Sequence, residues 1–307
     1  MPKTDFLSLR DFDRAELDAI LAKAKKLKAQ WRSGETTAAL KGQVLGLIFH
    51  KPSLRTRVSF EVGMRQLGGD ALYITDKEIG FGKREAIQDI GAVISRYVNG
   101  LMIRTFAQDD VAALARAADV PVINGLTDAL HPCQVLCDLF TLVEKGVELD
   151  GLRIAYLGDG NNLARSWMHA AMIYPLDLRL ACPEGFEPAG EEIERAQQQA
   201  PGKVRLLRDP REAVSGAQVV YTDTWTSMGQ EAETERRRQV FPPYQVNAAL
   251  LQDADAMVKV MHCLPAHRGD EITDEVMDGP NSVIYDQAEN RLHGQKGILL
   301  HCLGERG

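Results

Sequence analysis

The sequence predicts an α/β protein made of two doubly wound parallel-sheet domains joined by interdomain helices. Short apolar runs alternate with helical stretches along the 307 residues. The apolar runs are nearly continuous, which is typical of parallel strands buried on both faces. The length also fits two domains of about 150 residues each. A single eight-fold barrel is the alternative architecture.

Four strands are expected in the first half, at Val44–Phe49, Ala71–Ile74, Leu101–Ile103 and Pro121–Ile123. A helix over Arg55–Leu67 is indicated by apolar residues spaced four and seven apart. Gly68 and Gly69 follow it as a plausible C-cap. The stretch Arg84–Tyr97 repeats the same helical pattern.

Six strands are expected in the second half, at Arg153–Leu157, Asp177–Ala181, Val204–Leu207, Val219–Tyr221, Met257–Met261 and Val283–Tyr285. A helix over Cys133–Lys145 precedes Gly146 and Gly151, which indicates a domain boundary. The helical stretch Ala288–Leu303 is expected to pack back on the first domain. The predicted domains are residues 1–134 with 288–307, and residues 146–287, with 135–145 as an interdomain helix.

The composition argues against several classes of protein. A net charge of −7 disfavours nucleic-acid binding, which usually needs a basic surplus. No stretch approaches 18 apolar residues, so we expect no membrane span. The N-terminus has no apolar run after a basic start, so we expect no signal peptide. Five cysteines, an odd number in a long chain, favour reduced thiols in the cytoplasm.

The segment Lys51–Arg57 follows a predicted strand and opens a predicted helix. Helix N-termini carry free N–H groups and partial positive charge, so they bind phosphate-like anions. Ser53 and Thr56 add hydroxyl donors, and Arg55 and Arg57 add cations that pair with phosphate oxygens. A serine N-cap followed by surface arginines explains the segment equally well.

Two further features lie where the predicted strands of the first half end. Arg104 ends an apolar strand, and ligands of open parallel sheets lie beyond such ends. His131 and Gln134 open the next predicted helix and could donate to a carbonyl group; alternatively His131 only caps it. His131, Cys133 and Cys137 lack the paired spacing of a zinc site, so no metal is expected.

The loop Gly158–Asn162 superficially resembles a dinucleotide-binding fingerprint. Leu163 stands where the third glycine is required, and Ala181–Pro183 replaces the acid expected after the next strand. We therefore predict a ligand-binding loop with asparagine side chains and no nicotinamide cofactor. A plain strand–helix turn is the alternative.

Three segments of the second half combine polar groups with strand or helix ends. Asp223–Gly229 offers a carboxylate for an ammonium and Ser227 for the rest of an amino acid; an Asx-turn is the alternative. Cys263, at a strand end, is a candidate binding thiol, although buried cysteines are usually inert. Arg291 opens the last helix. Arg236–Arg238, among glutamates, is predicted to be a solvated helix face.

Together and in this order, four motifs resemble the aspartate/ornithine transcarbamoylase family. They are Ser-x-Arg-Thr-Arg, His-Pro-x-Gln, Asp-x-x-x-Ser-Met-Gly and His-Cys-Leu-Pro, and the resemblance runs from Phe6 to Leu303. It implies transfer of the carbamoyl group of carbamoyl phosphate to the side-chain amine of L-ornithine, giving L-citrulline and phosphate. It also implies no cofactor, no metal, and a homotrimer or a multiple of trimers.

The resemblance assigns carbamoyl phosphate to Ser53, Leu54, Arg55, Thr56, Arg57, Arg104, His131, Gln134, Cys263, Leu264 and Arg291. It assigns ornithine to Asn162, Asp223, Ser227 and Met228. It implies catalytic roles for Arg104, His131, Asp223, Cys263 and Arg291. The chain departs from the family at Leu54, where many members have Thr, and at Gly80, where many have a Gln ligand.

Other functions stay open from the sequence. The acceptor could be another amine, such as putrescine or acetylornithine, or the chain could be a non-catalytic binding relative. A nicotinamide oxidoreductase is disfavoured by the broken glycine pattern. The sequence does not distinguish arginine synthesis from arginine breakdown.

Overall fold

The computed structural model describes residues 3–80, 84–227 and 229–304. The chain divides into two compact units: unit 1 runs up to Phe140 and resumes at Asn290, and unit 2 is Thr141–Glu289. Helices α6 (Pro132–Glu144) and α13 (Ile284–Leu303) contain the two division points. Among the described residues, no helix is both long and apolar enough to cross a membrane.

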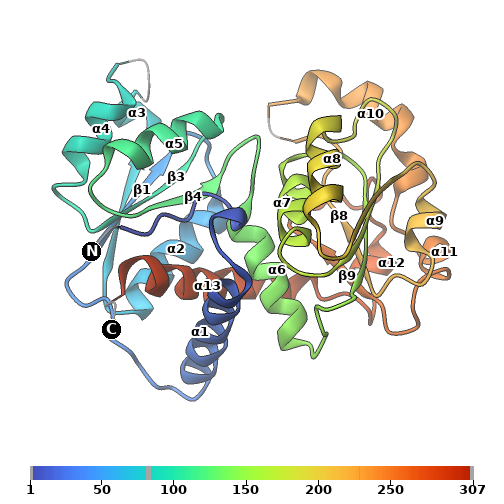
Figure 1. Ribbon diagram of the computed structural model, residues 1–307, viewed down its shortest axis with the longest axis horizontal. Helices are drawn as coiled ribbons and strands as arrows, with labels where there is room; N and C mark the ends of the chain where they lie inside the picture. The colour runs from blue at the N-terminus through green and yellow to red at the C-terminus, as the bar shows by residue number, and fades with distance from the viewer. Residues whose placement is uncertain (1–2, 81–83, 228, 305–307) are drawn as a thin grey trace. The chain divides into compact units, whose positions relative to one another are not determined.

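Unit 1 contains a four-stranded parallel sheet in the order β2-β1-β3-β4 (Figure 1). Its strands are β1 (Val44–Phe49), β2 (Asp70–Thr75), β3 (Gly100–Arg104) and β4 (Val122–Leu126). The strand order reverses between β1 and β3, whose carboxyl ends pair Phe49 with Arg104. Parallel sheets bind ligands at such a reversal, beyond the carboxyl ends of the strands.

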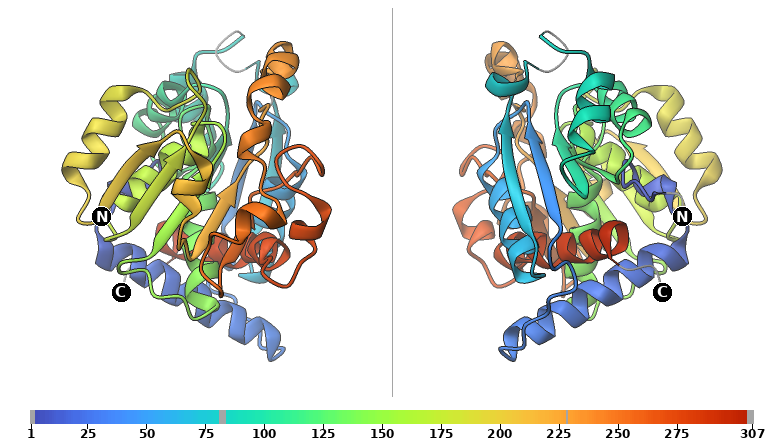
Figure 2. Two further views of the ribbon diagram at one scale, coloured as in Figure 1. Left: turned by 90° about the vertical axis from the view of Figure 1, so that its right-hand side faces the viewer. Right: turned by 90° about the vertical axis from the view of Figure 1, so that its left-hand side faces the viewer.

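Helices cover both faces of this sheet (Figures 1 and 2): α4 (Ile87–Ile94) and α5 (Gln108–Ala117) on one, α2 (Leu54–Gln66) and α13 on the other. The α4/α5 side buries a core that includes Ile48, Leu101, Ile103, Val111 and Leu114. The remaining helices are η1 (Leu9–Asp11), α1 (Arg14–Arg32) and α3 (Asp76–Ile79).

Helix α13 lies against α6 at a glycine. A Cβ added to Gly294 would lie 2.5 Å from Cys137 Sγ, so that a larger residue would require the two helices or the cysteine side chain to shift. The glycine therefore lets the two helices approach, and this approach brings Arg291, one turn earlier in α13, next to Gln134 of α6.

Unit 2 contains a five-stranded parallel sheet in the order β7-β6-β5-β8-β9. Its strands are β5 (Arg153–Leu157), β6 (Asp177–Ala181), β7 (Lys203–Leu207), β8 (Val219–Thr222) and β9 (Lys259–His262). Here the strand order reverses between β5 and β8, so a ligand is expected near the loops that follow these two strands.

The helices of unit 2 are α7 (Asn162–Ala171), α8 (Gly190–Gln199), α9 (Pro210–Val214), η2 (Glu231–Glu233), α10 (Thr234–Val240), η3 (Pro242–Tyr244), α11 (Ala248–Leu251) and α12 (Asp274–Met277). The main core includes Ala155, Leu157, Val220, Val260 and Ile284. The strand residues among these lie on one face of the sheet. Tyr156, Tyr221 and Met261 lie on the other face and are also fully buried, so both faces of the central strands are withdrawn from water as predicted.

The predicted fold class is confirmed: both sheets are parallel and both units are α/β. The strand predicted at Val283–Tyr285 is wrong, because α13 begins at Ile284. Its neighbour Ser282 makes only an isolated bridge to Val260, and the Val283 N–H donates to the Val260 carbonyl at 3.0 Å. Three apolar residues that touch a sheet edge once cannot be told from a strand by pattern alone.

Several other elements have different bounds from those predicted, among them two in the first half of the chain. The strand predicted at Pro121–Ile123 begins one residue later and continues to Leu126, because Asn124 and Gly125 interrupt the apolar run without ending the pairing. The helix predicted over Arg84–Tyr97 is confined to α4, since Glu85 and Ala86 are not helical.

Candidate active site

The N-terminus of α2 has the features of an anion site. Ser53 is its N-cap, with Oγ accepting from the Thr56 N–H at 3.4 Å and donating to Thr56 Oγ1 at 3.1 Å. The first turn contains no acidic residue, and the exposed Arg55 lies in it. Free N–H groups, the helix dipole and Arg55 together favour a bound phosphate.

Leu54 and Arg57 lie differently from the rest of this motif. Leu54 opens α2 with 76% of its surface exposed, so its predicted contribution would come from its backbone. The Arg57 guanidinium lies 3.9 Å from the centre of the Tyr73 ring, and its Nε donates to Glu61 at 3.4 Å. Arg57 thus has other partners in this structure, and its phosphate role stays a prediction.

Arg291 of α13 connects two of the predicted motifs. Its guanidinium is buried and donates to Thr56 Oγ1 at 3.1 Å and to Gln134 Oε1 at 2.7 Å. Gln134 in turn donates to Asp138 at 2.8 Å, which fixes its amide orientation. Residues from α2, α6 and α13, predicted separately from the sequence, therefore meet around one cation.

His131 precedes α6 and is buried. Burial lowers the pKa of His131 well below its ordinary value, and the charges of Arg291 and Arg104 lower it further. His131 is thus a neutral imidazole at neutral pH, able to donate a hydrogen bond without carrying charge. The Arg104 carbonyl accepts from the N–H groups of His50 and Lys51 at 2.9 and 3.2 Å, which ties the end of β3 to the loop after β1.

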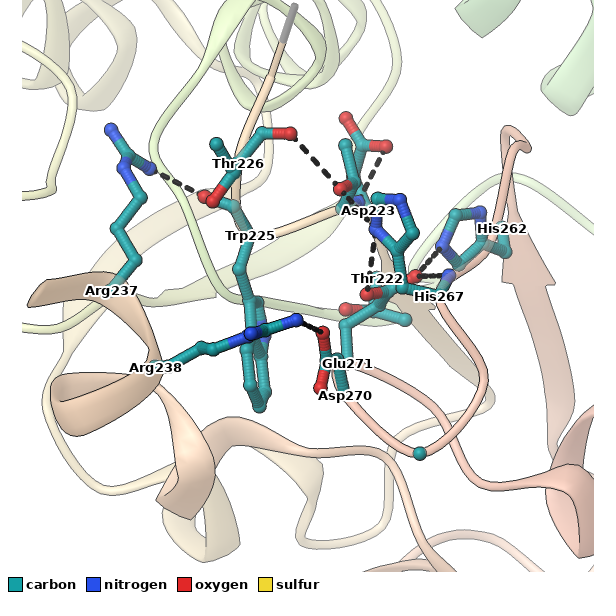
Figure 3. Close-up of polar contacts among 12 residues, drawn as sticks. Thr222, Asp223, Trp225, Thr226, Arg237, Arg238, His262, His267, Asp270 and Glu271 are labelled. Carbon is teal, nitrogen blue, oxygen red and sulfur yellow. Dashed lines mark hydrogen bonds and ion pairs between the residues drawn. The ribbon is translucent and has the colours of Figure 1, made fainter. Parts of the chain in front are cut away.

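In unit 2, Asp223 directly follows β8 and has a buried, oriented carboxylate (Figure 3). Asn161 Nδ2 donates to its Oδ2 at 2.7 Å. Its Oδ1 accepts from the Cys263 thiol at 2.9 Å and from the Thr224 N–H at 2.8 Å. These three donors are neutral, so they orient the carboxylate without neutralising its negative charge. An ammonium group could therefore pair with it.

The loop after β5 supplies Asn161, which lies in the predicted ligand-binding loop but was given no role of its own from the sequence. Asn161 is the N-cap of α7, where its Oδ1 accepts from the N–H groups of Leu163 and Ala164 at 2.9 and 3.3 Å. Its amide nitrogen is then left to hold Asp223. An asparagine directly before a helix is a preferred N-cap, and that preference was the signal that could have identified it.

The other predicted ornithine residues lie on the same loops. Asn162 is the first residue of α7 and is partly exposed. Ser227 is also partly exposed, and its N–H donates to Gln230 at 3.3 Å. Met228 lies outside the described residues, so its predicted contact is not tested. Gly80 is the left-handed C-cap of α3 and has no side chain that could replace the Gln of other family members.

Asp223, His262 and Cys263 have ligand-type atoms within 4.8 Å of one another. The His262 ring is already engaged on both sides: Nδ1 accepts from the Leu264 N–H at 2.8 Å, and Nε2 lies 3.0 Å from Glu271 Oε1. A metal ion would have to displace one of these contacts. The expectation of a metal-free site stays a prediction.

The prediction that Arg236–Arg238 forms a solvated face is wrong for Arg237. This side chain is buried, lies 3.0 Å from Asp159 Oδ2, and donates to the Trp225 carbonyl at 2.6 Å (Figure 3). Successive residues of a helix point about 100° apart, so a run of charges does not share one face. Burial raises the pKa of Asp159 to about 6, although Arg237 opposes this shift.

Two family models match the chain. One is described as the carbamoyl-P binding domain of aspartate/ornithine carbamoyltransferase and matches residues 4–144. The other is described as the Asp/Orn binding domain of the same family and matches residues 150–302. The two matches fall one on each side of residues 145–149.

Relatives of similar length match almost the whole chain. The ornithine carbamoyltransferase of Syntrophus aciditrophicus is 54% identical over 297 residues, covering 97% of this chain and 98% of that protein. The ornithine carbamoyltransferase of Thermococcus kodakarensis is 50% identical over 303 residues, covering 98% and 96%. The solved structure of ornithine carbamoyltransferase from Pyrococcus furiosus has a TM-score of 0.95 and 48% identity, covering 99% of this chain and 98% of that one.

Proposed function

The chain belongs to the aspartate/ornithine carbamoyltransferase family, and we propose that it transfers the carbamoyl group of carbamoyl phosphate to the side-chain amine of L-ornithine, giving L-citrulline and phosphate. This proposal is supported by two sites of opposite charge, one in each unit. Unit 1 presents a helix N-terminus with arginines. Unit 2 presents the oriented carboxylate of Asp223.

Unit 1 is assigned to carbamoyl phosphate. Ser53, Thr56 and the first N–H groups of α2 would bind the phosphate oxygens together with Arg55. The carbonyl oxygen would be bound by Arg104, His131 and Arg291, with Gln134 fixed by Arg291. Donors held in place before the reaction stabilise the oxyanion that develops on this carbonyl.

Unit 2 is assigned to ornithine. Asp223 would pair with the α-ammonium group, and Asn162, Ser227 and Met228 would complete the contacts to the amino acid. Cys263, hydrogen-bonded to Asp223, and Leu264 would lie toward the carbamoyl group. In residue ranges, we assign 1–134 with 288–307 to carbamoyl phosphate, 146–287 to ornithine, and 135–145 to the helix between them.

The reaction then needs no electron transfer. The neutral side-chain amine attacks the carbonyl carbon and forms a tetrahedral oxyanion, which collapses and expels phosphate. The amine proton leaves with the phosphate, which is a competent base. The protein contributes alignment of the two substrates, worth up to about 7–11 kcal/mol, and stabilisation of the oxyanion.

We also propose a homotrimer, or a multiple of trimers, acting in the cytoplasm in arginine metabolism. Unit 1 exposes large apolar side chains on α2 and the edge strand β2, namely Leu54, Val58 and Leu72, which a second copy would cover. None of the five cysteines, all of which lie among the described residues, forms a disulfide, which agrees with a reducing compartment. Size-exclusion chromatography with light scattering tests the oligomer.

The direct test of the activity is citrulline formation. The purified chain, incubated with carbamoyl phosphate and L-ornithine, is expected to produce citrulline and phosphate in equal amounts. Omitting either substrate should abolish both products. Absence of citrulline from the folded protein would instead support a non-catalytic relative.

A further inference from the structure

Glu271 is a buried carboxylate that joins two parts of the segment after β9. Its Oε1 lies 3.0 Å from His262 Nε2 and accepts from the His267 N–H at 2.6 Å. Its Oε2 lies 3.8 Å from His267 Nδ1 (Figure 3). Both Glu271 and His262 have fully buried side chains. One carboxylate thus fixes the two ends of the segment that carries Cys263 and Leu264.

The proton on His262 can be assigned from its contacts. Its Nδ1 accepts from the Leu264 N–H at 2.8 Å, so the ring proton is on Nε2 and is donated to Glu271. This contact holds Leu264 at φ 59°, a backbone conformation that non-glycine residues rarely adopt. Such conformations persist where the surroundings enforce them, and here Glu271 and His262 do so.

His267 extends this cluster to the neighbouring loop. Its Nδ1 lies 2.9 Å from Thr224 Oγ1. The single hydroxyl hydrogen of Thr224 is donated to the Thr226 carbonyl at 3.2 Å, so Thr224 Oγ1 accepts a hydrogen bond from the Nδ1–H group of His267. His267 therefore connects the segment after β9 with the segment after β8.

We infer that His267 is a positioning residue for the amino-acid side of the site, acting through Thr224 on Asp223; this inference rests on the proposed function. Thr224 follows Asp223, and its N–H donates to the same Oδ1 that accepts from Cys263. A displaced Thr224 would change the orientation of the carboxylate that is to receive the ammonium group. The exposed His267 ring is itself assigned no contact with substrate.

Steady-state kinetics of five variants test this inference. His267→Ala and Thr224→Val each remove the link from one side, and each should raise the KM for ornithine about 3- to 10-fold, the usual worth of one hydrogen bond. The KM for carbamoyl phosphate should stay within about 2-fold of the wild-type value. The double variant should be no worse than either single variant, because both act through one contact.

His267→Asn is the conservative variant, because its amide nitrogen takes the place of Nδ1 as a donor to Thr224; it should restore the ornithine KM. The matched control is Arg268→Ala. Arg268 is the next residue, but it pairs with Asp274 and Asp278 at 2.7 Å on the surface. Its removal should leave the ornithine KM within about 2-fold of wild type.

Citrulline formation by the wild-type chain tests the proposed function, and the KM values of the variants test the role of His267. If the wild-type chain forms no citrulline, the proposed function fails. If it does, and His267→Ala leaves the ornithine KM unchanged or raises both KM values alike, the positioning role is overturned. Should His267→Ala not fold, Thr224→Val decides in its place: a selective rise in the ornithine KM supports the link, and no change overturns it.

Discussion

Cys263 Sγ lies 2.9 Å from Asp223 Oδ1, although 40 residues separate them in the chain. The two residues follow adjacent parallel strands, β9 and β8, whose carboxyl ends meet at one edge of the sheet. The thiol therefore acts as a donor to the carboxylate proposed to bind ornithine. The orientation of Asp223 can therefore be tested by mutating the residues that donate to its carboxylate.

The first prediction concerns Asn161. Asn161→Asp keeps the α7 cap, because a carboxylate also accepts from the first N–H groups, but replaces the amide donor to Asp223 with a like charge. The KM for ornithine should rise by about 10-fold or more, since a charge-assisted hydrogen bond becomes a repulsion. The melting temperature should also fall, because the repulsion acts in the folded state, so circular dichroism at the assay temperature is the control for folding. An unchanged ornithine KM would show that Asn161 does not orient Asp223.

The second prediction concerns Arg291. Arg291→Lys retains the positive charge but cannot reach both Thr56 and Gln134 with a planar fork. We expect kcat/KM for carbamoyl phosphate to fall about 100-fold, the scale seen when one oxyanion donor is lost. Circular dichroism confirms folding. Near-normal turnover would remove Arg291 from the proposed carbonyl site.

The third prediction concerns pH and His131. The pKa of His131 is depressed in the folded protein by burial, Arg291 and Arg104, whereas the unfolded chain protonates it near 6.5. Below that pH the unfolded state binds more protons, so stability falls as pH falls. In His131→Asn this contribution is absent, so the melting temperature should drop less steeply from pH 7 to pH 5 than in the wild type. Parallel slopes would contradict a neutral His131.

The fourth prediction compares two adjacent arginines by urea unfolding. Arg237→Ala leaves the buried Asp159 without its cation, which should lower the free energy of unfolding by about 3–5 kcal/mol at pH 8. Arg238 pairs with Asp270 at 3.5 Å on the surface, so Arg238→Ala should cost at most about 1 kcal/mol. Equal losses would mean that the burial of Arg237 has no energetic consequence.

The loss in Arg237→Ala should also depend on pH. Asp159, with a pKa of about 6 in the folded wild type, can take a proton when its partner is removed. The destabilisation should therefore be smaller at pH 5 than at pH 8, since a neutral carboxyl tolerates burial better.

Apolar runs were enough to predict the fold class and nearly every strand, because parallel strands buried on both faces leave a strong pattern. Strand ends then located Arg104, Asp223 and Cys263. What the pattern could not predict are contacts that depend on the direction of single side chains. Arg237 lies among charged neighbours in the sequence, but its side chain is buried. Glu271 has no sequence feature that distinguishes it from a surface acid, and its burial is known only from the structure. Val283 was mistaken for a strand because the apolar start of a buried helix gives the same signal.

The most direct test of the central claim compares kcat/KM for four amines with carbamoyl phosphate at saturation. Ornithine is predicted to be far ahead of putrescine, N-acetylornithine and aspartate. Putrescine lacks the α-carboxylate, N-acetylornithine lacks the α-ammonium that would pair with Asp223, and aspartate adds a carboxylate that Asp223 would repel. Sites built for a polar group discriminate strongly against analogues that lack it. If putrescine or N-acetylornithine matched ornithine, the role given to Asp223 would be wrong and the chain would be a carbamoyltransferase with a different acceptor.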